Sequence, residues 1–228
     1  MIQAARKLVI NFHGLGHPHD RVGPDEVPYW CDFKLFEQLV DRIDELRHDR
    51  QANIGITFDD GNISDLTIAA PVLRARKMSA TFFVCAGRIA DDPAYMSSTQ
   101  LNALETMGMR IGCHGYNHIR LRGLSPAALA RETTDAREVL EAVLGHPVTQ
   151  FAIPFGAYNR RVIAALAGFR HVHTSDHWMS AADSRIVTRH SYIHGWDDRM
   201  PERILSQSPG PLRRMTMAAR LLAKRNRP

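Results

Sequence analysis

The 228-residue chain lacks any long apolar stretch and is poor in cysteine. No run of about 18 consecutive apolar residues occurs, so we expect no membrane-spanning helix. The three cysteines are odd in number and scattered, which argues against a disulfide framework and favours a reducing, cytoplasmic setting. The apolar run at residues 8–12 is short and leads into His13-Gly14. We interpret it as a core strand and not as a signal peptide.

Acidic residues are absent from residues 209–228, which carry six basic residues. The net charge of the chain is +5, so removing those six positive charges leaves about −1 for residues 1–208. The larger part therefore gives no sign of a broad basic face for nucleic acid. We expect a globular domain over residues 1–208 and a basic tail over 209–228. Because apolar residues alternate with the charges, the tail is either a solvated helix or an amphipathic helix on an anionic membrane surface.

Short apolar runs alternate with longer amphipathic ones over most of the chain. The predicted strands are 7–12, 52–58, 80–84, 110–113, 149–153, 170–174 and 185–189. The predicted helices are 33–48, 64–76, 98–107, 125–144 and 159–168. This alternation is typical of βαβ units and a mostly parallel sheet. We therefore expect one α/β domain, built as an open sheet or as a distorted, incomplete (β/α) barrel with about seven parallel strands.

Polar side chains follow several predicted strands at the carboxyl end, where parallel folds collect their working residues. His13 follows the first strand, and His114 follows the fourth. Segment 57–61, TFDDG, closes the second strand with two carboxylates. Gly61 lets the backbone turn at once, so Asp59 and Asp60 can both reach one site.

Segment 114–118, HGYNH, places two histidines four residues apart. Two histidines and one carboxylate suit a hydrolytic metal, because they leave coordination positions open for water and substrate. Taken separately, Asp-Asp-Gly is also typical of a plain turn, and HxxxH is typical of two surface histidines. The pairing of the two motifs is far more specific than either one.

The two motifs together resemble the polysaccharide deacetylase family, also called the NodB-homology domain or carbohydrate esterase family 4. Residues 80–84, ATFFV, 151–159, FAIPFGAYN, and 174–176, TSD, are similar to further segments of that family. The resemblance spans roughly residues 8–195. An HG pair and a Pro-Tyr-Trp segment near the start are similar in particular to members from bacterial exopolysaccharide biosynthesis. The resemblance implies a NodB-like barrel.

The resemblance also implies roles for individual residues. Asp60, His114 and His118 would bind a divalent metal, which is usually Zn²⁺ in the family and sometimes Co²⁺ or Ni²⁺. Asp59 would be the general base in the hydrolysis of an N-acetyl group from an amino sugar. A backbone N–H near Phe155 would add an oxyanion donor. The expected substrate-binding residues are Pro154, Phe155, Gly156, Tyr158 and Asp176.

The chain departs from the family pattern at two places. An arginine that usually orients the base is replaced by Ala152. Either another cation takes over its role, for which Arg189 is the candidate, or the base is held less firmly. The usual C-terminal Leu-x-His motif of the general acid is matched only by its histidine, His194. Some members are circularly permuted and carry this motif on the first strand, where Asn11-Phe12-His13 lies. We therefore favour His13 as the acid, and His194 stays the alternative.

Three functions remain open at the level of sequence. The first is a metal-dependent deacetylase of an N-acetylated sugar in a polysaccharide or glycolipid. The second is an amide hydrolase of the same fold acting on a small cyclic amide, and the third is a carbohydrate-binding protein without activity. The intact acid and histidine motifs favour the first. The expected partners are an N-acetylated sugar and, through the basic tail, the inner face of a membrane, with no nucleic acid.

Overall fold

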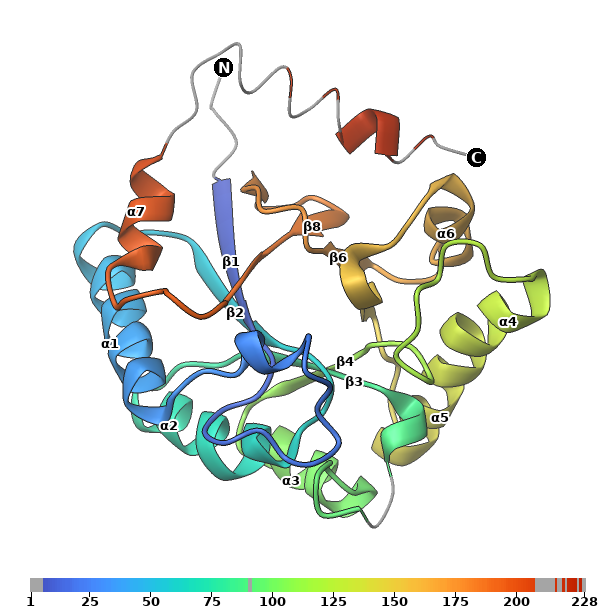
Figure 1. Ribbon diagram of the computed structural model, residues 1–228, viewed down its shortest axis with the longest axis horizontal. Coiled ribbons are helices and arrows are strands. Elements are labelled where there is room, and N and C mark those ends of the chain that lie inside the picture. Colours follow the sequence, from blue (N-terminus) through green and yellow to red (C-terminus); the bar gives the residue numbers. More distant parts are fainter. Residues whose placement is uncertain are drawn as a thin grey trace.

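A nine-stranded sheet, curved into a nearly closed barrel, forms the centre of the molecule (Figure 1). The computed structural model describes residues 6–89, 92–207, 216, 219, 221–224 and 226. The strands are β1 (Arg6–Phe12), β2 (Ile54–Phe58), β3 (Thr81–Val84), β4 (Arg110–Cys113), β5 (Gln150–Ala152), β6 (His171–Thr174), β7 (Ser180–Ala181), β8 (Ile186–Thr188) and β9 (His190–Ser191). Their order is β7-β1-β2-β3-β4-β5-β6-β8, with β9 beside β1.

Two consecutive strands join the two ends of this sheet. β8 pairs in parallel with β6, and β9, which begins two residues after β8 ends, pairs in parallel with β1. Arg189 lies between them and so stands where the barrel nearly closes. The seven predicted strands correspond to β1–β6 and β8, which confirms the distorted α/β barrel. β7, antiparallel to β1, and β9 were not predicted, because a two-residue strand shows no alternation.

Helices surround the sheet on its outside (Figure 1). They are α1 (Phe33–Asp49), α2 (Ala70–Ala75), α3 (Ser98–Thr106), α4 (Pro126–Ala130), α5 (Ala136–Leu144), α6 (Arg160–Ala165) and α7 (Met200–Ser206). Two π-helical segments, η2 (Asp65–Ala69) and η4 (Arg131–Asp135), continue into α2 and α5, and short 3₁₀ turns are η1 (Val27–Tyr29), η3 (Ala86–Arg88) and η5 (Pro154–Gly156).

The predicted helix 125–144 is one run, α4-η4-α5, with the expected signals at both ends. The Ser125 side chain accepts a hydrogen bond from the Ala128 N–H, and Pro126 occupies the first helical position. Gly145 ends the helix in the left-handed conformation, at φ +74°. The π-helical insertion in the middle was not predicted. It proves important, because it carries Glu132.

Phenylalanines at the strand ends form the core next to the site. Phe58 stacks on Phe82 at a centroid distance of 4.6 Å and on Phe12 at 5.5 Å, and all three are fully buried. Burying each ring stabilises the fold by about 1.5–3 kcal/mol. Side chains alternate along a strand, so the neighbours Asn11 and Thr57 point to the opposite face of the sheet. The packing of these rings therefore fixes the position of the polar residues that follow each strand, such as His13 and Asp59.

The three cysteines are buried as free thiols, and Cys113 packs in the core. Among the described residues, no helix combines the length and apolar character that a bilayer crossing needs. The predicted amphipathic tail, and the domain boundary at residue 208, fall largely outside the described residues. The tail's described residues include Lys224, whose contacts are given below.

Candidate metal and catalytic site

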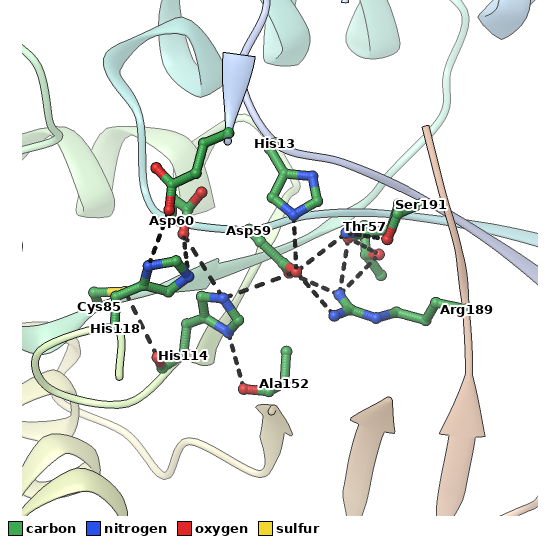
Figure 2. Close-up of polar contacts among 12 residues, drawn as sticks. His13, Thr57, Asp59, Asp60, Cys85, His114, His118, Ala152, Arg189 and Ser191 are labelled. Atoms are coloured by element: carbon green, nitrogen blue, oxygen red, sulfur yellow. Dashed lines mark hydrogen bonds and ion pairs between the residues drawn. The ribbon is translucent and has the colours of Figure 1, made fainter. Parts of the chain in front are cut away.

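The strand ends bring the predicted acids and histidines together. In Figure 2, Asp59 lies between Arg189 on one side and His114 on the other, with His13 above it and Asp60 and His118 beyond His114. These residues follow different strands, and several are far apart in sequence. All of them lie at the carboxyl end of the barrel, as the sequence predicted.

Asp60, His114 and His118 form a group in which one donor atom from each lies within 4.8 Å of the others. Asp60 Oδ1 is 3.2 Å from His118 Nε2 and 3.7 Å from His114 Nε2. The other ring nitrogen of His114, Nδ1, is 2.9 Å from the Ala152 carbonyl oxygen. Since a carbonyl only accepts, Nδ1 carries the proton and Nε2 keeps its lone pair. Burial lowers the pKa of His114 to about 4, so the ring is neutral at neutral pH.

The donor set fits a divalent cation such as Zn²⁺. Asp60 Oδ1 is buried and accepts no hydrogen bond within the described part of the chain, although Arg88 Nη1 is 3.3 Å away. A buried carboxylate oxygen without a partner is costly unless a cation neutralises it. Burial would raise the pKa of Asp60, but His118, His13, His114 and Arg88 together hold it below the usual value. The group thus offers one anionic oxygen and two imidazoles, the set expected of a hydrolytic metal site.

Asp59 is held by a two-pronged ion pair with Arg189. Arg189 Nη1 donates to Oδ1 at 2.7 Å, and Nη2 donates to Oδ2 at 2.8 Å. Asn11 Nδ2 donates a third hydrogen bond to Oδ2 at 3.1 Å. Arg189 is fully buried and Asp59 is 2% exposed. Burial acts to raise the pKa of Asp59, but the charges of Arg189, His114 and His13 lower it well below the usual range.

Arg189 takes the place of the arginine that is missing at Ala152. The arginine comes from the β8–β9 junction and not from β5, yet it reaches the carboxylate that the family's usual arginine would orient. Ala152 contributes its backbone carbonyl to His114. The expectation that Arg189 replaces the missing cation agrees with these contacts.

The two candidates for the general acid lie in different surroundings. His13 Nε2 is 3.9 Å from Asp59 Oδ2, and its ring packs against Tyr29 at a centroid distance of 5.0 Å. His194 Nε2 is 3.1 Å from the Trp30 carbonyl oxygen, and the residue is exposed. The geometry therefore brings His13, and not His194, next to the two aspartates.

The Pro154-Phe155-Gly156 turn flanks the metal group. The Phe155 ring is 48% exposed and lies against His118 at a centroid distance of 4.5 Å. Phe155 has φ +56°, a region that disfavours residues with a side chain. The following Gly156 also has a positive φ, at +58°. The turn thus presents an apolar ring beside the histidine at some cost in backbone strain.

Tyr158 and Asp176, predicted to bind substrate, lie in a contact network of their own. The Tyr158 hydroxyl donates to Asp176 Oδ2 at 2.7 Å, and the Thr174 hydroxyl donates to the same oxygen at 2.7 Å. Lys224 Nζ donates to Asp176 Oδ1 at 2.7 Å and lies 4.3 Å from the Tyr158 ring centre. Tyr158 is 1% exposed, so its ring offers no open face for stacking on a sugar in this structure.

Sequence reasoning missed the residue that shapes the HGYNH loop. Glu132 is 1% exposed, and its carboxylate accepts from the N–H groups of Tyr116 at 2.8 Å and Asn117 at 3.0 Å. The Asn117 side chain donates to it as well, at 2.8 Å. Gly115 has φ +84°, and a Cβ there would come within 2.9 Å of the Glu132 carboxylate. The signal available in the sequence was an acid at helical spacing from Leu129, Ala136 and Leu140, on the apolar face of the predicted helix.

The loop 14–30 covers this end of the barrel. Gly14 is required because a Cβ there would lie 2.2 Å from the Trp30 ring, which links the HG pair to the Pro-Tyr-Trp segment. From the same loop, Glu26 Oε1 comes 3.6 Å from His118 Nδ1, on the nitrogen that does not face Asp60. Carboxylates in this position orient histidine ligands. Neither Glu26 nor Arg88 was predicted as a site residue.

Comparison with known families gives a consistent result. The family model described as polysaccharide deacetylase matches residues 47–172. A chitooligosaccharide deacetylase of Azorhizobium caulinodans is 32% identical over 116 residues, which are 50% of this chain and 52% of that protein. A chitooligosaccharide deacetylase of Rhizobium leguminosarum bv. trifolii is 29% identical over 126 residues, or 54% and 56%. The matched part is thus about half the length of each relative.

Solved structures share the fold over nearly the whole chain. The Streptococcus pyogenes deacetylase PplD, solved in complex with acetate, has a TM-score of 0.76 and 18% identity, with 89% of this chain and 99% of that chain covered. IcaB from Ammonifex degensii has a TM-score of 0.67 and 22% identity, with 89% and 97% covered. At these identities the likeness concerns the fold alone.

Proposed function

Because the chain belongs to the polysaccharide deacetylase family, we propose that it is a metal-dependent hydrolase that removes an N-acetyl group from an amino sugar. The observation that carries this proposal is the adjacency of two differently supported aspartates. Asp60 faces two histidines and has a buried oxygen that accepts no hydrogen bond from the residues the structure describes. Asp59, next to it, is fixed by Arg189 and faces His13. The two adjacent aspartates, Asp59 and Asp60, therefore suit two separate tasks.

Asp60, His114 and His118 are the residues that would hold the metal, and Zn²⁺ is the ion we propose. When bound, such a cation polarises the acetyl carbonyl and lowers the pKa of a water molecule toward about 7. Asp59 serves as the general base, since its low pKa keeps it ionised and Arg189 fixes its orientation. His13, whose Nε2 lies 3.9 Å from Asp59 Oδ2, donates a proton to the leaving amine nitrogen.

We propose a sugar polymer or oligomer as the substrate class, as in the names of the matched relatives. The exposed Phe155 ring beside His118 provides an apolar face on which a sugar ring can lie. A role in exopolysaccharide or glycolipid synthesis, a cytoplasmic location and contact of the basic tail with a membrane remain parts of the proposal. The first two rest on the HG pair, the Pro-Tyr-Trp segment and the scattered cysteines, and the third rests on a tail that lies mostly outside the described residues.

Acetate release from a short oligomer of N-acetylglucosamine tests the function. The full chain is assayed as purified, after chelation and after addition of Zn²⁺. We expect chelation to abolish release and Zn²⁺ to restore it. The matched variant Asp60→Asn should stay inactive under all three conditions, while the exposed Asp25→Asn should behave as the wild type. Release that survives both chelation and Asp60→Asn would contradict the proposal.

A further inference from the structure

A polar cavity opens at the end of the barrel where the strands begin, opposite the deacetylase residues. Its volume is about 490 Å³, within the range of small-molecule sites. Residues at the amino ends of β1 to β6 line it, whereas the deacetylase residues follow the carboxyl ends of the strands. The cavity extends as far as Thr57, two residues before Asp59 in the chain. The Thr57 hydroxyl donates a hydrogen bond to Asn11 Oδ1. The two sites are therefore separate.

The lining of this cavity is strongly positive. Its cationic residues are Lys7, Arg47, Arg110 and Arg170, joined by His171 and His173, and none of its lining residues is Asp or Glu. This is not a reflection of overall charge, because residues 1–208 together carry about −1 once the six basic tail residues are removed from the net +5. Four cations without an acid is thus a local concentration of charge.

Within the described part of the chain, no carboxylate forms an ion pair with a cation of this cavity. Lys7 and Arg110 have no ion-pair partner within the described ranges, and the guanidinium of Arg47 is held only by the Ile54 carbonyl oxygen and the more distant charge of Asp44. Lys7 is half-buried and crosses Gly55, where a Cβ would lie 3.0 Å from Lys7 Cε. Burial, and then the charges of Arg110 and Arg47, lower the pKa of Lys7. Bringing these charges together is unfavourable unless an anion joins them.

A buried histidine adds a second, independent sign of a ligand. His173 lines the cavity, is 4% exposed, and contacts Gln150 Oε1 through Nε2 at 3.0 Å. Its other nitrogen, Nδ1, is buried and has no hydrogen-bond partner in the described part of the chain. Since the Gln150 oxygen only accepts, Nε2 carries the proton and Nδ1 keeps a lone pair that calls for a donor, such as the P–OH group of a singly protonated phosphate.

We propose that the amino-terminal mouth of the barrel is a binding site for a phosphate group, free or carried by a small molecule. Arginine and lysine together supply the forked and point-charge donors that phosphate oxygens accept. A cavity of about 490 Å³ accommodates inorganic phosphate or a small phosphate monoester. This site does not depend on the deacetylase function.

Calorimetric titration of the full chain with inorganic phosphate, at ionic strength matched with NaCl, tests the site. A second titration with glycerol 3-phosphate separates free from esterified phosphate as the preferred source. We expect saturable binding of one anion per chain, weakened about tenfold or more by Lys7→Met and by Arg110→Gln. The exposed Arg74→Gln, which lies outside the cavity, should bind as the wild type.

Lys7→Met keeps the length of the side chain and removes an unpaired charge, so it should not lower the Tm in phosphate-free buffer. Phosphate should raise the Tm of the wild type and not that of this variant. Arg110 is exposed, so Arg110→Gln should fold normally. Its phosphate binding therefore tests the site even if Lys7→Met fails to fold. The basic tail and the metal group are unchanged in both variants. No binding, or equal binding in wild type and both variants, would overturn the proposal.

Discussion

Arg189→Met is the substitution whose consequence the structure defines best. It keeps much of the side-chain volume but removes the guanidinium that pairs with Asp59 through two hydrogen bonds, at 2.7 and 2.8 Å. It also removes the donor to Asn11 Oδ1 at 2.8 Å. Arg189 is 0% exposed, so water does not replace these contacts without rearrangement. Asp59 is left as a buried carboxylate whose one remaining side-chain donor, among the described residues, is Asn11.

Removing one partner of a buried ion pair costs about 3–5 kcal/mol of unfolding free energy, because the other charge stays buried. For a chain of this length, each kcal/mol changes the Tm by about 2–4 °C, which gives a loss of roughly 6–20 °C. The surface pair Arg203–Asp197, with side chains 42% and 56% exposed, provides the control. Arg203→Met should change the Tm far less than Arg189→Met, because water screens both charges of the surface pair.

Urea denaturation of the chelator-treated full chain, followed by circular dichroism, measures both variants. A double-mutant cycle with Asp59→Asn isolates the pair, because the double variant leaves no unpaired charge. We expect a coupling free energy of about 2 kcal/mol or more. A loss below about 1 kcal/mol for Arg189→Met, or additive effects in the cycle, would refute the view that Arg189 is what holds Asp59.

Three further predictions concern the loop, the acid and the tail. Glu132→Gln should lower the unfolding free energy by about 1–3 kcal/mol and weaken Zn²⁺ binding, because the N–H donors of the HGYNH loop lose an anionic acceptor. The control Glu138→Gln, at an exposed position of the same helix, should change neither quantity. His13→Ala should lower kcat for acetate release about 10²–10⁴-fold and His194→Ala much less; the reverse order would exchange their roles. Flotation with anionic vesicles at low salt should fall when the chain ends at residue 209, and equal flotation would exclude the tail as a membrane contact.

The barrel could be predicted from the sequence because its strands and helices are strongly periodic. Each of the seven predicted strands is present, and the predicted helix 125–144 begins and ends at its expected residues. The two-residue strands β7 and β9 carry no such signal. The π-helical segment that contains Glu132 could not be predicted either, because it differs from the surrounding helix only in a single turn of i→i+5 backbone hydrogen bonding.

The metal group could be predicted because each of its residues belongs to a short motif at a strand end. Apart from Arg189, the residues that support this group and the neighbouring Asp59 could not be predicted, since they come from distant parts of the chain. Glu26 reaches His118 from the first loop, and Asn11 reaches Asp59 across β1 and β2. The predicted role of Tyr158 in substrate binding stays a prediction, and in this structure its ring is buried, with Lys224 4.3 Å from the ring centre and Asp176 at its hydroxyl.

Metal content and acetate release, measured together on Asp59→Asn and His114→Ala, distinguish base from ligand. If Asp59 is the base and His114 holds the metal, Asp59→Asn keeps stoichiometric Zn²⁺ but loses acetate release, while His114→Ala loses both. Full acetate release by Asp59→Asn, or stoichiometric Zn²⁺ in His114→Ala, would contradict this division of tasks at the paired aspartates.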